Sequence, residues 1–312
     1  MNILVTGGLG FIGSNFIKHR WEVYDDSIIN VDIQTYAGNR DNLPPPIVNA
    51  YSWEKVCINN TDAITNIMRN NDIDVVVHFA AESHVDRSIE DSDVFIQTNV
   101  VGTHNMLECF TKHAKSGARF VHVSTDEVYG DLQEDEPAFT ENSQIKPSSP
   151  YAASKASSDI LALSYHRTHG INLCVTRCSN NYGPNQHTEK LIPNMITRAM
   201  DGKSLPVYGD GRNIRDWIHV QDHCEAISAV ISSGVSGNVY NIGGEHELRN
   251  IEIVETILKK LKKSNRMIDY VEDRKGHDWR YAMNIDKIKS HLGWSPRIDF
   301  DSGISELIRS YK

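Results

Sequence analysis

The stretch Thr6-Gly-Gly-Leu-Gly-Phe-Ile-Gly13 decides the fold of this 312-residue chain. It follows an apolar run at residues 2–6 that is typical of a buried strand, and it leads into residues 11–20, whose pattern predicts a helix. The glycines allow a tight turn, a close approach of the backbone to a pyrophosphate, and close packing of helix against strand. The N-terminus of the helix then faces the phosphate charge. A glycine-rich loop can also be a plain turn, so this interpretation needs support from the rest of the chain.

Asp32 gives that support, because it ends the second predicted strand, residues 28–32. Its carboxylate can accept hydrogen bonds from the ribose hydroxyls of adenosine, and it would repel a 2′-phosphate. Alone, Asp32 is an ordinary turn residue at a strand end. Together with the glycines it predicts a site for NAD rather than NADP.

Apolar runs continue to alternate with amphipathic stretches along the chain. The further strands predicted here are residues 74–79, 119–124 and 172–177, and the helices are residues 61–70, 91–115, 151–168 and 191–201. Near-continuous apolar strands that alternate with helices are typical of a parallel sheet covered on both faces. The predicted fold class is therefore α/β, a doubly wound, Rossmann-like parallel sheet with a smaller mixed α/β lobe at the C-terminal end.

After about residue 180 the alternation loosens. Short strands at residues 205–208, 239–242 and 267–270 mix with helices at residues 221–232, 250–263, 285–292 and 303–310. We expect an NAD-binding domain at residues 1–180 and a substrate-binding lobe at residues 181–312. The boundary is approximate, and the chain can cross between the two lobes.

The composition is ordinary for a globular protein, with 39% hydrophobic and 23% charged residues. The net charge of −9 argues against a sequence-independent nucleic-acid binder, which would present a basic face. We expect no secretory signal and no membrane span. The five cysteines lack zinc-like spacing, and His219 and His223 lack acidic or cysteine partners at metal spacing. These patterns predict a reduced, cytoplasmic protein with no metal site and no nucleic-acid or membrane partner.

Polar clusters follow the predicted strands at the point where each strand ends. Ala80-Ala-Glu-Ser83, Thr125-Asp-Glu127 and Asn180-Asn181 each come after a strand, as the glycine loop and Asp32 do. In an open parallel sheet the ligand crevice lies outside the carboxyl ends of the strands. We therefore expect all these clusters to face one cleft.

Tyr151 and Lys155 lie four residues apart at the start of a predicted helix and so share one helix face. Such a pair is often accidental, a helix start with a surface lysine. In this context, the ammonium and a positive nicotinamide would lower the pKa of the phenol from its usual value near 10. The phenolate could then take the proton of a sugar hydroxyl while the adjacent carbon gives its hydride to NAD.

Asp126 and Glu127 are two further groups that can transfer protons, and a simple dehydrogenase does not need them. The alternative is a solvated pair of acids on a loop. As a functional pair, one carboxyl would be protonated and its neighbour ionised, which close like charges favour. The pair therefore predicts an elimination step coupled to the hydride transfer.

Several longer motifs make a resemblance specific. The glycine loop, Tyr151/Lys155, Arg177-Cys-Ser-Asn-Asn-Tyr-Gly-Pro184 and Leu292-Gly-Trp-Ser-Pro296 resemble the extended short-chain dehydrogenase/reductase family that acts on nucleotide sugars. Five further motifs most closely resemble one branch of that family, which dehydrates dTDP-glucose at carbons 4 and 6. They are Thr125-Asp-Glu-Val-Tyr-Gly130, Ala80-Ala-Glu-Ser-His-Val-Asp-Arg-Ser88, Glu189-Lys-Leu-Ile-Pro193, Tyr208-Gly-Asp-Gly-Arg-Asn-Ile-Arg-Asp-Trp217 and Gly276-His-Asp-Trp-Arg-Tyr281.

The resemblance implies a lyase of deoxysugar biosynthesis that uses NAD and makes a 4-keto-6-deoxy sugar from dTDP-glucose. It implies five catalytic residues, Thr125, Asp126, Glu127, Tyr151 and Lys155. It implies cofactor contacts at Gly7, Gly10, Phe11, Ile12, Gly13, Asp32, Thr35, Ile58, Ala80, Ala81, Ser83, Thr98, Tyr151, Lys155 and Asn181. It implies substrate contacts at Ser83, Thr125, Asn180, Lys190, Leu191, Pro206, Tyr208, Arg215, Asn250, Arg274 and His277.

Other functions stay open at this point. The alternatives are a UDP-sugar epimerase or decarboxylase, another nucleotide-glucose 4,6-dehydratase, and a catalytically silent nucleotide sensor. Epimerases and decarboxylases of the family usually lack the Asp-Glu pair, and a silent sensor should lose Tyr151 or Lys155. The family also implies a homodimer, for which the helices at residues 91–115 and 151–168 are the candidates.

Two positions depart from the family pattern. Cys57-Ile58 stands where the family commonly has an Asp that contacts adenine, so that hydrogen bond must be weaker or come from the backbone. Arg274-Lys-Gly-His277 replaces the usual Arg-Pro-Gly-His, which predicts a less rigid loop.

Overall fold

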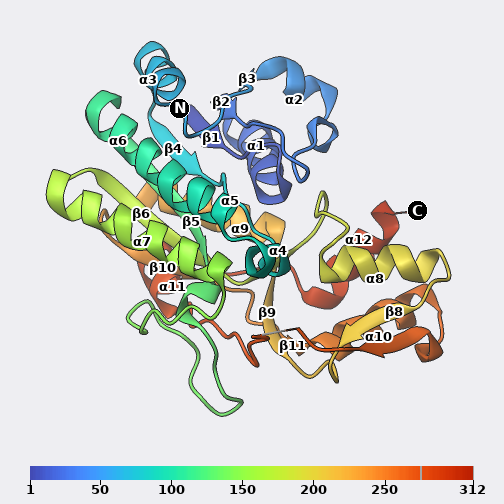
Figure 1. Ribbon diagram of the computed structural model, residues 1–312. Helices are drawn as coiled ribbons and strands as arrows, with labels where there is room; N and C mark the ends of the chain where they lie inside the picture. Colours follow the sequence, from blue (N-terminus) through green and yellow to red (C-terminus); the bar gives the residue numbers. More distant parts are fainter. Residues whose placement is uncertain (275, 312) are drawn as a thin grey trace.

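A seven-stranded parallel sheet forms the centre of the larger lobe in the computed structural model, which describes residues 1–274 and 276–311 (Figure 1). The strand order is β10-β6-β5-β4-β1-β2-β3. Every pairing in this order is parallel. The strands are β1 Asn2–Thr6, β2 Ser27–Val31, β3 Ser52–Glu54, β4 Val75–His78, β5 Arg119–Thr125, β6 Asn172–Cys178 and β10 Val239–Ile242.

Helices cover both faces of this sheet because successive strand residues point to opposite sides. Leu4, Val76 and Phe120 pack with α3 Thr61–Asn70, α6 Thr103–His113 and α7 Pro150–His169 on one face. Their strand neighbours Ile3, Val77 and Val121 pack on the other face with α1 Phe11–Tyr24, α2 Pro45–Ala50, α9 Val220–Ser233 and α11 Asp286–Leu292. Both predicted features, the parallel sheet and its two covered faces, are confirmed.

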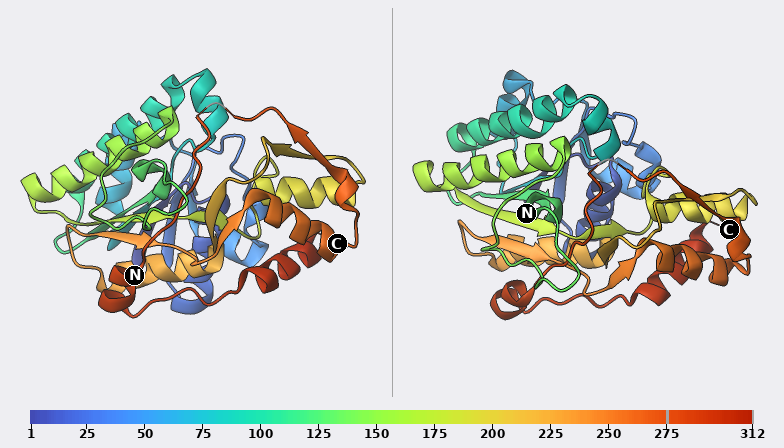
Figure 2. Two further views of the ribbon diagram at one scale, coloured as in Figure 1. Left: turned by 90° about the horizontal axis from the view of Figure 1, so that it is seen from below. Right: turned by 60° about the horizontal axis from the view of Figure 1, so that its bottom comes forward.

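The smaller lobe lies beyond the carboxyl ends of the strands and has its own core (Figure 2). Its sheets are β11-β9-β7 and β12-β8. The strands are β7 Asn180–Tyr182, β8 Leu205–Tyr208, β9 Ile214–His219, β11 Glu247–Arg249 and β12 Ile268–Val271. Ile196, Ile257 and Leu307 join the helices of this core, which are α8 Leu191–Met200, α10 Asn250–Leu261 and α12 Phe300–Ser310.

The chain crosses between the lobes after residue 181. β10 pairs with β6 in the main sheet, with Val239 opposite Val175, and α9 packs on the same sheet. The division into residues 1–180 and 181–312 stays a prediction for the folding units, but the main sheet draws on both ranges.

Some element predictions are wrong. Residues 91–115 are not one regular helix: α5 Asp93–Phe95 is followed by a π-helical turn at Ile96–Gly102 and then by α6. A separate short helix, α4 Val85–Glu90, precedes them and was not predicted. The short strands β3, β7, β9 and β11 were also not predicted, because pairing with distant segments rather than local pattern defines them.

Candidate active site

A cavity of about 480 Å³ opens at the carboxyl edge of the main sheet, where the strand ends β1, β2, β4, β5 and β6 meet. The predicted polar clusters do face one cleft. The residues predicted to bind the cofactor all line it: Gly7, Gly10, Phe11, Ile12, Gly13, Asp32, Thr35, Ile58, Ala80, Ala81, Ser83, Thr98, Tyr151, Lys155 and Asn181.

The glycine loop is built so that only glycine fits two of its positions. Gly7 has a φ of +72°, and a Cβ there would lie 2.8 Å from the backbone nitrogen of Ala80. A Cβ on Gly13 would lie 2.3 Å from the carbonyl oxygen of Gly7. The loop therefore packs directly on the end of β4, and α1 packs directly on the loop, which leaves the start of the helix open to the cavity.

Asp32 is fixed at one end of the cavity by the backbone around it. Its carboxylate accepts hydrogen bonds from the Leu9 nitrogen at 2.8 Å and from the Gln34 nitrogen at 2.7 Å. Burial raises the pKa of Asp32, and these two hydrogen bonds oppose that rise. A carboxylate beside a glycine loop and a helix N-terminus fits the adenosine ribose and the diphosphate of NAD.

The adenine side of the cavity has the departure seen in the sequence. Cys57, Ile58 and Asn59 all line it. The carbonyl oxygen of Ile58 accepts a hydrogen bond from Asn105 Nδ2 at 2.5 Å. In this part of the cavity a thiol stands where the family commonly has a carboxylate.

Tyr151 and Lys155 open α7, which Ser149 caps by accepting a hydrogen bond from the Ala152 nitrogen at 3.1 Å. Both side chains are buried, so Lys155 is not a surface lysine. The Lys155 ammonium donates to the Val123 carbonyl oxygen at 2.8 Å, which fixes it under the strand end. The pair therefore faces the cavity one turn apart.

The protein's own groups do not lower the pKa of Tyr151, as the sequence had suggested for Lys155. Burial raises the pKa of the phenol well above 10, and Glu127, Cys178 and Asp126 raise it further. Only a hydrogen bond with Thr125 is resolved as opposing this rise. Burial is the largest cause of this rise, and burial cannot be read from the spacing of Tyr151 and Lys155 in the sequence.

Asp126 and Glu127 lie in a single helical turn, Asp126–Tyr129, that directly follows β5. Thr125 caps this turn: its hydroxyl accepts from the Glu127 nitrogen at 3.3 Å and donates to Asp126 Oδ1 at 3.2 Å. Asp126 is buried, and Glu127 is partly buried. Both line the cavity beside Tyr151, so they are not a solvated loop pair.

Burial raises the pKa of both carboxyls, but their charged neighbours differ. The pKa of Asp126 is raised well above its usual value by burial and by Glu127 and Asp216, while Arg215 lowers it. The pKa of Glu127 is raised by burial, while Arg215 and Lys190 lower it. Carboxylate neighbours therefore favour the protonated form of Asp126, whereas cations favour the ionised form of Glu127.

The three predicted substrate cations converge on Glu127, because Arg215, Lys190 and Arg274 all lower its pKa. Arg215 is buried on β9, stacks over the Tyr281 ring at 4.3 Å and donates to the Asp278 carbonyl oxygen at 2.8 Å. Lys190 Nζ donates to the Ser83 carbonyl oxygen at 3.0 Å. The smaller lobe thus brings positive charge to the open side of the cavity.

The other predicted substrate residues lie at different points of the cleft. Ser83, Thr125, Asn180 and Lys190 line the cavity itself. Leu191 begins α8, Pro206 and Tyr208 lie on β8, and Asn250 begins α10. The Tyr208 ring contacts His277, 6.5 Å between centroids, and Arg274, 5.4 Å from the guanidinium carbon. Lys275, the second departure, lies outside the described residues.

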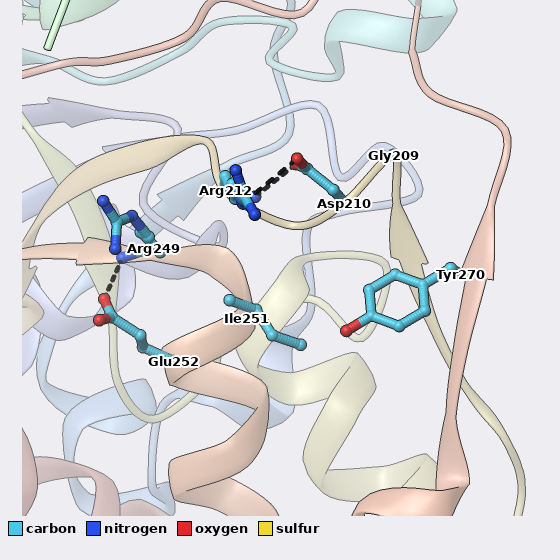
Figure 3. Close-up of a pocket in the computed structure, with 7 residues that line it drawn as sticks. All are labelled: Gly209, Asp210, Arg212, Arg249, Ile251, Glu252 and Tyr270. Carbon is cyan, nitrogen blue, oxygen red and sulfur yellow. Dashed lines mark hydrogen bonds and ion pairs between the residues drawn. The ribbon is translucent and has the colours of Figure 1, made fainter.

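A second cavity of about 540 Å³ lies in the smaller lobe, and none of the predicted site residues lines it (Figure 3). It is bounded by the turn at residues 209–212, the start of α10 and Tyr270 on β12. Its two arginines are paired, Arg212 with Asp210 at 3.4 Å and Arg249 with Glu134 at 3.0 Å.

Asn99 is a site residue that the sequence did not reveal. It lies in the π-helical turn and is buried. Its side chain accepts from the Glu82 nitrogen at 2.9 Å and donates to the Glu82 carbonyl oxygen at 3.0 Å and to Ser154 Oγ at 2.8 Å. It thereby joins the loop after β4 to the helix that carries Tyr151. The local sequence gave little signal, because Asn99 follows two other polar residues, Gln97 and Thr98.

Within residues 1–274 and 276–311, no group of three or more His, Cys, Asp or Glu side chains is arranged to hold a metal ion. None of the helices in the same described ranges is long and apolar enough to cross a membrane.

Comparison with known proteins shows the family to which the chain belongs. Residues 4–307 match the family model described as GDP-mannose 4,6 dehydratase. The chain is 47% identical to a dTDP-glucose 4,6-dehydratase of Escherichia coli, over all of this chain and 93% of that protein. The crystal structure of the dTDP-glucose 4,6-dehydratase DesIV of Streptomyces venezuelae, with NAD and TYD bound, is 46% identical and has a TM-score of 0.95, with coverage of 100% and 97%.

The fold alone does not separate dehydratases from epimerases. The UDP-glucose 4-epimerase of Thermotoga maritima also has a TM-score of 0.92, at 26% identity, over all of this chain and 98% of that one. Sequence identity does separate them, because this chain is 46–47% identical to the dehydratases over its full length. The chain therefore belongs to the GDP-mannose 4,6 dehydratase family of extended short-chain dehydrogenase/reductases, and within it to the dTDP-glucose 4,6-dehydratases.

Proposed function

We propose that this chain is a dTDP-glucose 4,6-dehydratase, an NAD-dependent lyase that converts dTDP-glucose to dTDP-4-keto-6-deoxyglucose and water. The observation that carries the proposal is the buried Asp126 beside the partly buried Glu127, next to Tyr151 in one cavity. An epimerase needs the phenol but has no use for the carboxyl pair.

NAD, when bound, accepts the hydride from sugar C4 and later returns it to C6. Tyr151 takes the proton of the C4 hydroxyl, and Thr125 lines the same cavity beside it. The resulting C4 ketone acidifies the hydrogen on C5. Lys155, fixed on the Val123 carbonyl, holds positive charge beneath this site.

Glu127, as the carboxylate, removes the C5 proton, and Asp126, as the acid, protonates the C6 hydroxyl, which leaves as water. A proton returns to C5 when the hydride returns to C6, so NAD is regenerated and the net change is loss of one water. The charged neighbours support these roles, since Glu127 and Asp216 raise the pKa of Asp126, whereas Arg215 and Lys190 lower that of Glu127. A positioned acid or base typically contributes about 10²–10⁴ in rate.

We assign the substrate diphosphate to Arg215 and Lys190, because guanidinium and ammonium groups are the usual partners of phosphate. Ser83, Thr125 and Asn180 line the cavity where the sugar would lie. The nucleotide would lie against Tyr208, Asn250, Arg274 and His277, with Leu191 and Pro206 adjacent.

Incubation of the NAD-loaded protein with dTDP-glucose, followed by mass spectrometry, tests the function. Loss of one water supports the dehydratase, and an isomer of unchanged mass supports a 4-epimerase. A panel of UDP-, GDP- and CDP-glucose scored for a 4-keto product tests the choice of base. Binding of nucleotide sugar without any conversion would indicate a sensor and would contradict the proposal.

We further propose a homodimer formed through α6 and α7. Ile160 on α7 is 59% exposed and Val101, just before α6, is 40% exposed, and burial of both side chains would favour association. Sedimentation should show a dimer that Ile160→Glu converts to a monomer. We also propose a cytoplasmic location, supported by five free cysteines, four of them buried.

A further inference from the structure

Three segments meet at the rim of the cofactor cavity: residues 34–38 after β2, residues 82–87, which run from the loop after β4 into α4, and residues 186–190 before α8. Each contributes lining residues, among them Thr35, Ser83 and Lys190. The first segment begins two residues after Asp32, at the ribose end of the cavity. The third segment lies toward Glu127 and the smaller lobe. Its Lys190 is near enough to Glu127 to lower the pKa of that carboxyl group.

Tyr36 is the side chain of the first segment that reaches the other two. Its ring lies under the Arg87 guanidinium, with Cζ 3.9 Å from the ring centroid. The His187 ring meets it edge-on, 5.7 Å between centroids at 87°. Tyr36 is 42% exposed, so these contacts lie at the surface of the protein, on the rim and not on the floor of the cavity.

Glu189 joins the same side chains from the third segment. Its Oε2 lies 3.3 Å from Arg87 Nη2 and 3.6 Å from His84 Nε2. Burial and the charge of Glu189 raise the pKa of Tyr36 to about 12, so the phenol keeps its proton and can donate to this carboxylate. The three segments are thus tied by one carboxylate, one guanidinium and one aromatic ring.

We infer that Tyr36, Arg87 and Glu189 form a latch that keeps the cofactor in its cavity for a whole turnover. The reason comes from the proposed function, on which this inference rests. The hydride taken from C4 must return to C6 of the same sugar, so a cofactor that left in its reduced form would strand an oxidised sugar. The latch residues are positioning residues, since they hold the rim and do not touch the reacting atoms.

The test is the rate at which bound NAD leaves the protein, followed by trapping released NAD with an excess of a second dehydrogenase. Tyr36→Ala removes the ring that two segments contact, and it should speed dissociation about tenfold. Glu189→Gln keeps the shape but removes the charge, and it should speed dissociation about threefold. Arg87→Ala combined with Tyr36→Ala should cost less than the sum of the two single variants, because their shared contact is lost in each of them.

The chain offers a matched control in Tyr24, at the end of α1. There Arg20 lies over the ring at 3.8 Å and His19 meets it at 5.6 Å, so the chemistry is the same. The chain neighbours of Tyr24 do not line the cavity, whereas Thr35 and Ala37 on either side of Tyr36 do. Tyr24→Ala should release NAD at the rate of the unaltered protein. Equal rates for all variants, or equal acceleration in Tyr24→Ala and Tyr36→Ala, would overturn the latch.

A second measurement separates the latch from the proposed function. With dTDP-glucose, Tyr36→Ala should release reduced cofactor in a measurable fraction of turnovers, whereas the unaltered protein and Tyr24→Ala should not. If dTDP-glucose is not converted by any variant, the proposed function fails, while the dissociation rates of NAD still decide the latch.

Discussion

The two sides of the active-site cleft hold their functional groups in different ways. On the cofactor and catalytic side, Asp32, Asp126 and Lys155 are buried and bonded to neighbouring backbone or hydroxyl groups. On the substrate side, Arg274 is held by a partly exposed ion pair with Asp86 at 2.8 Å, with 28% and 36% of the two side chains exposed. The comparison teaches that burial preorganises the groups proposed for the chemistry, whereas Arg274, proposed to bind the nucleotide, is held by an ion pair that solvent can reach.

The largest effect is expected from the carboxyl pair. Glu127→Gln and Asp126→Asn should each lower the overall rate about 10²–10⁴-fold, because elimination loses its base or its acid. Oxidation at C4 should persist, seen as absorbance of the reduced cofactor in a single turnover. Exchange of the C5 hydrogen with solvent should be lost in Glu127→Gln. Full turnover by either variant would contradict the assigned roles.

The pH dependence of the rate should follow from the same two groups. Glu127 must be ionised, and its pKa is raised, so the rate should fall as the pH drops through that raised value. Asp126 must be protonated, and its pKa is raised further, so the rate should fall as the pH rises through it. The profile is therefore a bell, measured as rate against pH. Residual activity of Asp126→Asn should lack the alkaline limb, and retention of that limb would show that another group is the acid.

Arg215→Lys should have the next largest effect, because Arg215 is the buried cation on the substrate side. Lysine keeps the charge but loses the planar fork that binds phosphate with two hydrogen bonds, so KM should rise about 10- to 100-fold. Arg212→Lys, at a 68% exposed side chain paired with Asp210, is the matched control and should leave KM unchanged. Equal KM values for both variants would remove Arg215 from the binding site.

The cofactor side of the comparison could largely be predicted from the sequence, because its signals are local. The spacing of Gly7, Gly10 and Gly13 and the step from Tyr151 to Lys155 follow from one loop and one helix. The substrate side was harder, since β11 exists only through its pairing with β9, where Leu248 lies opposite Arg215. The protein's own groups do not lower the pKa of Tyr151 for a related reason, because burial, which raises it, is a property of the assembled fold.

Cys57→Asp tests the cofactor side of the cleft, because it introduces the carboxylate that is usual in the family at this position. Cys57 lines the cavity beside Ile58, whose carbonyl oxygen is already taken by Asn105. A carboxylate there could accept a hydrogen bond from the adenine amino group, so NAD should bind about tenfold more tightly. Titration of the cofactor-free protein with NAD, by quenching of its tryptophan fluorescence, measures this. Cys57→Ser is the control, and an unchanged affinity in Cys57→Asp would place adenine elsewhere.

The smallest effect is expected from Arg274→Ala, at the solvent-exposed end of the substrate side. Its guanidinium pairs with Asp86 and lies 5.4 Å from the centre of the Tyr208 ring. Exposed ion pairs contribute little, so KM for dTDP-glucose should rise only about two- to fivefold, with kcat unchanged. A loss as large as that of Arg215→Lys would show that the loop closes over the substrate and buries Arg274 in the complex. In that case the contrast between a buried catalytic side and an exposed substrate side would hold only for the free protein.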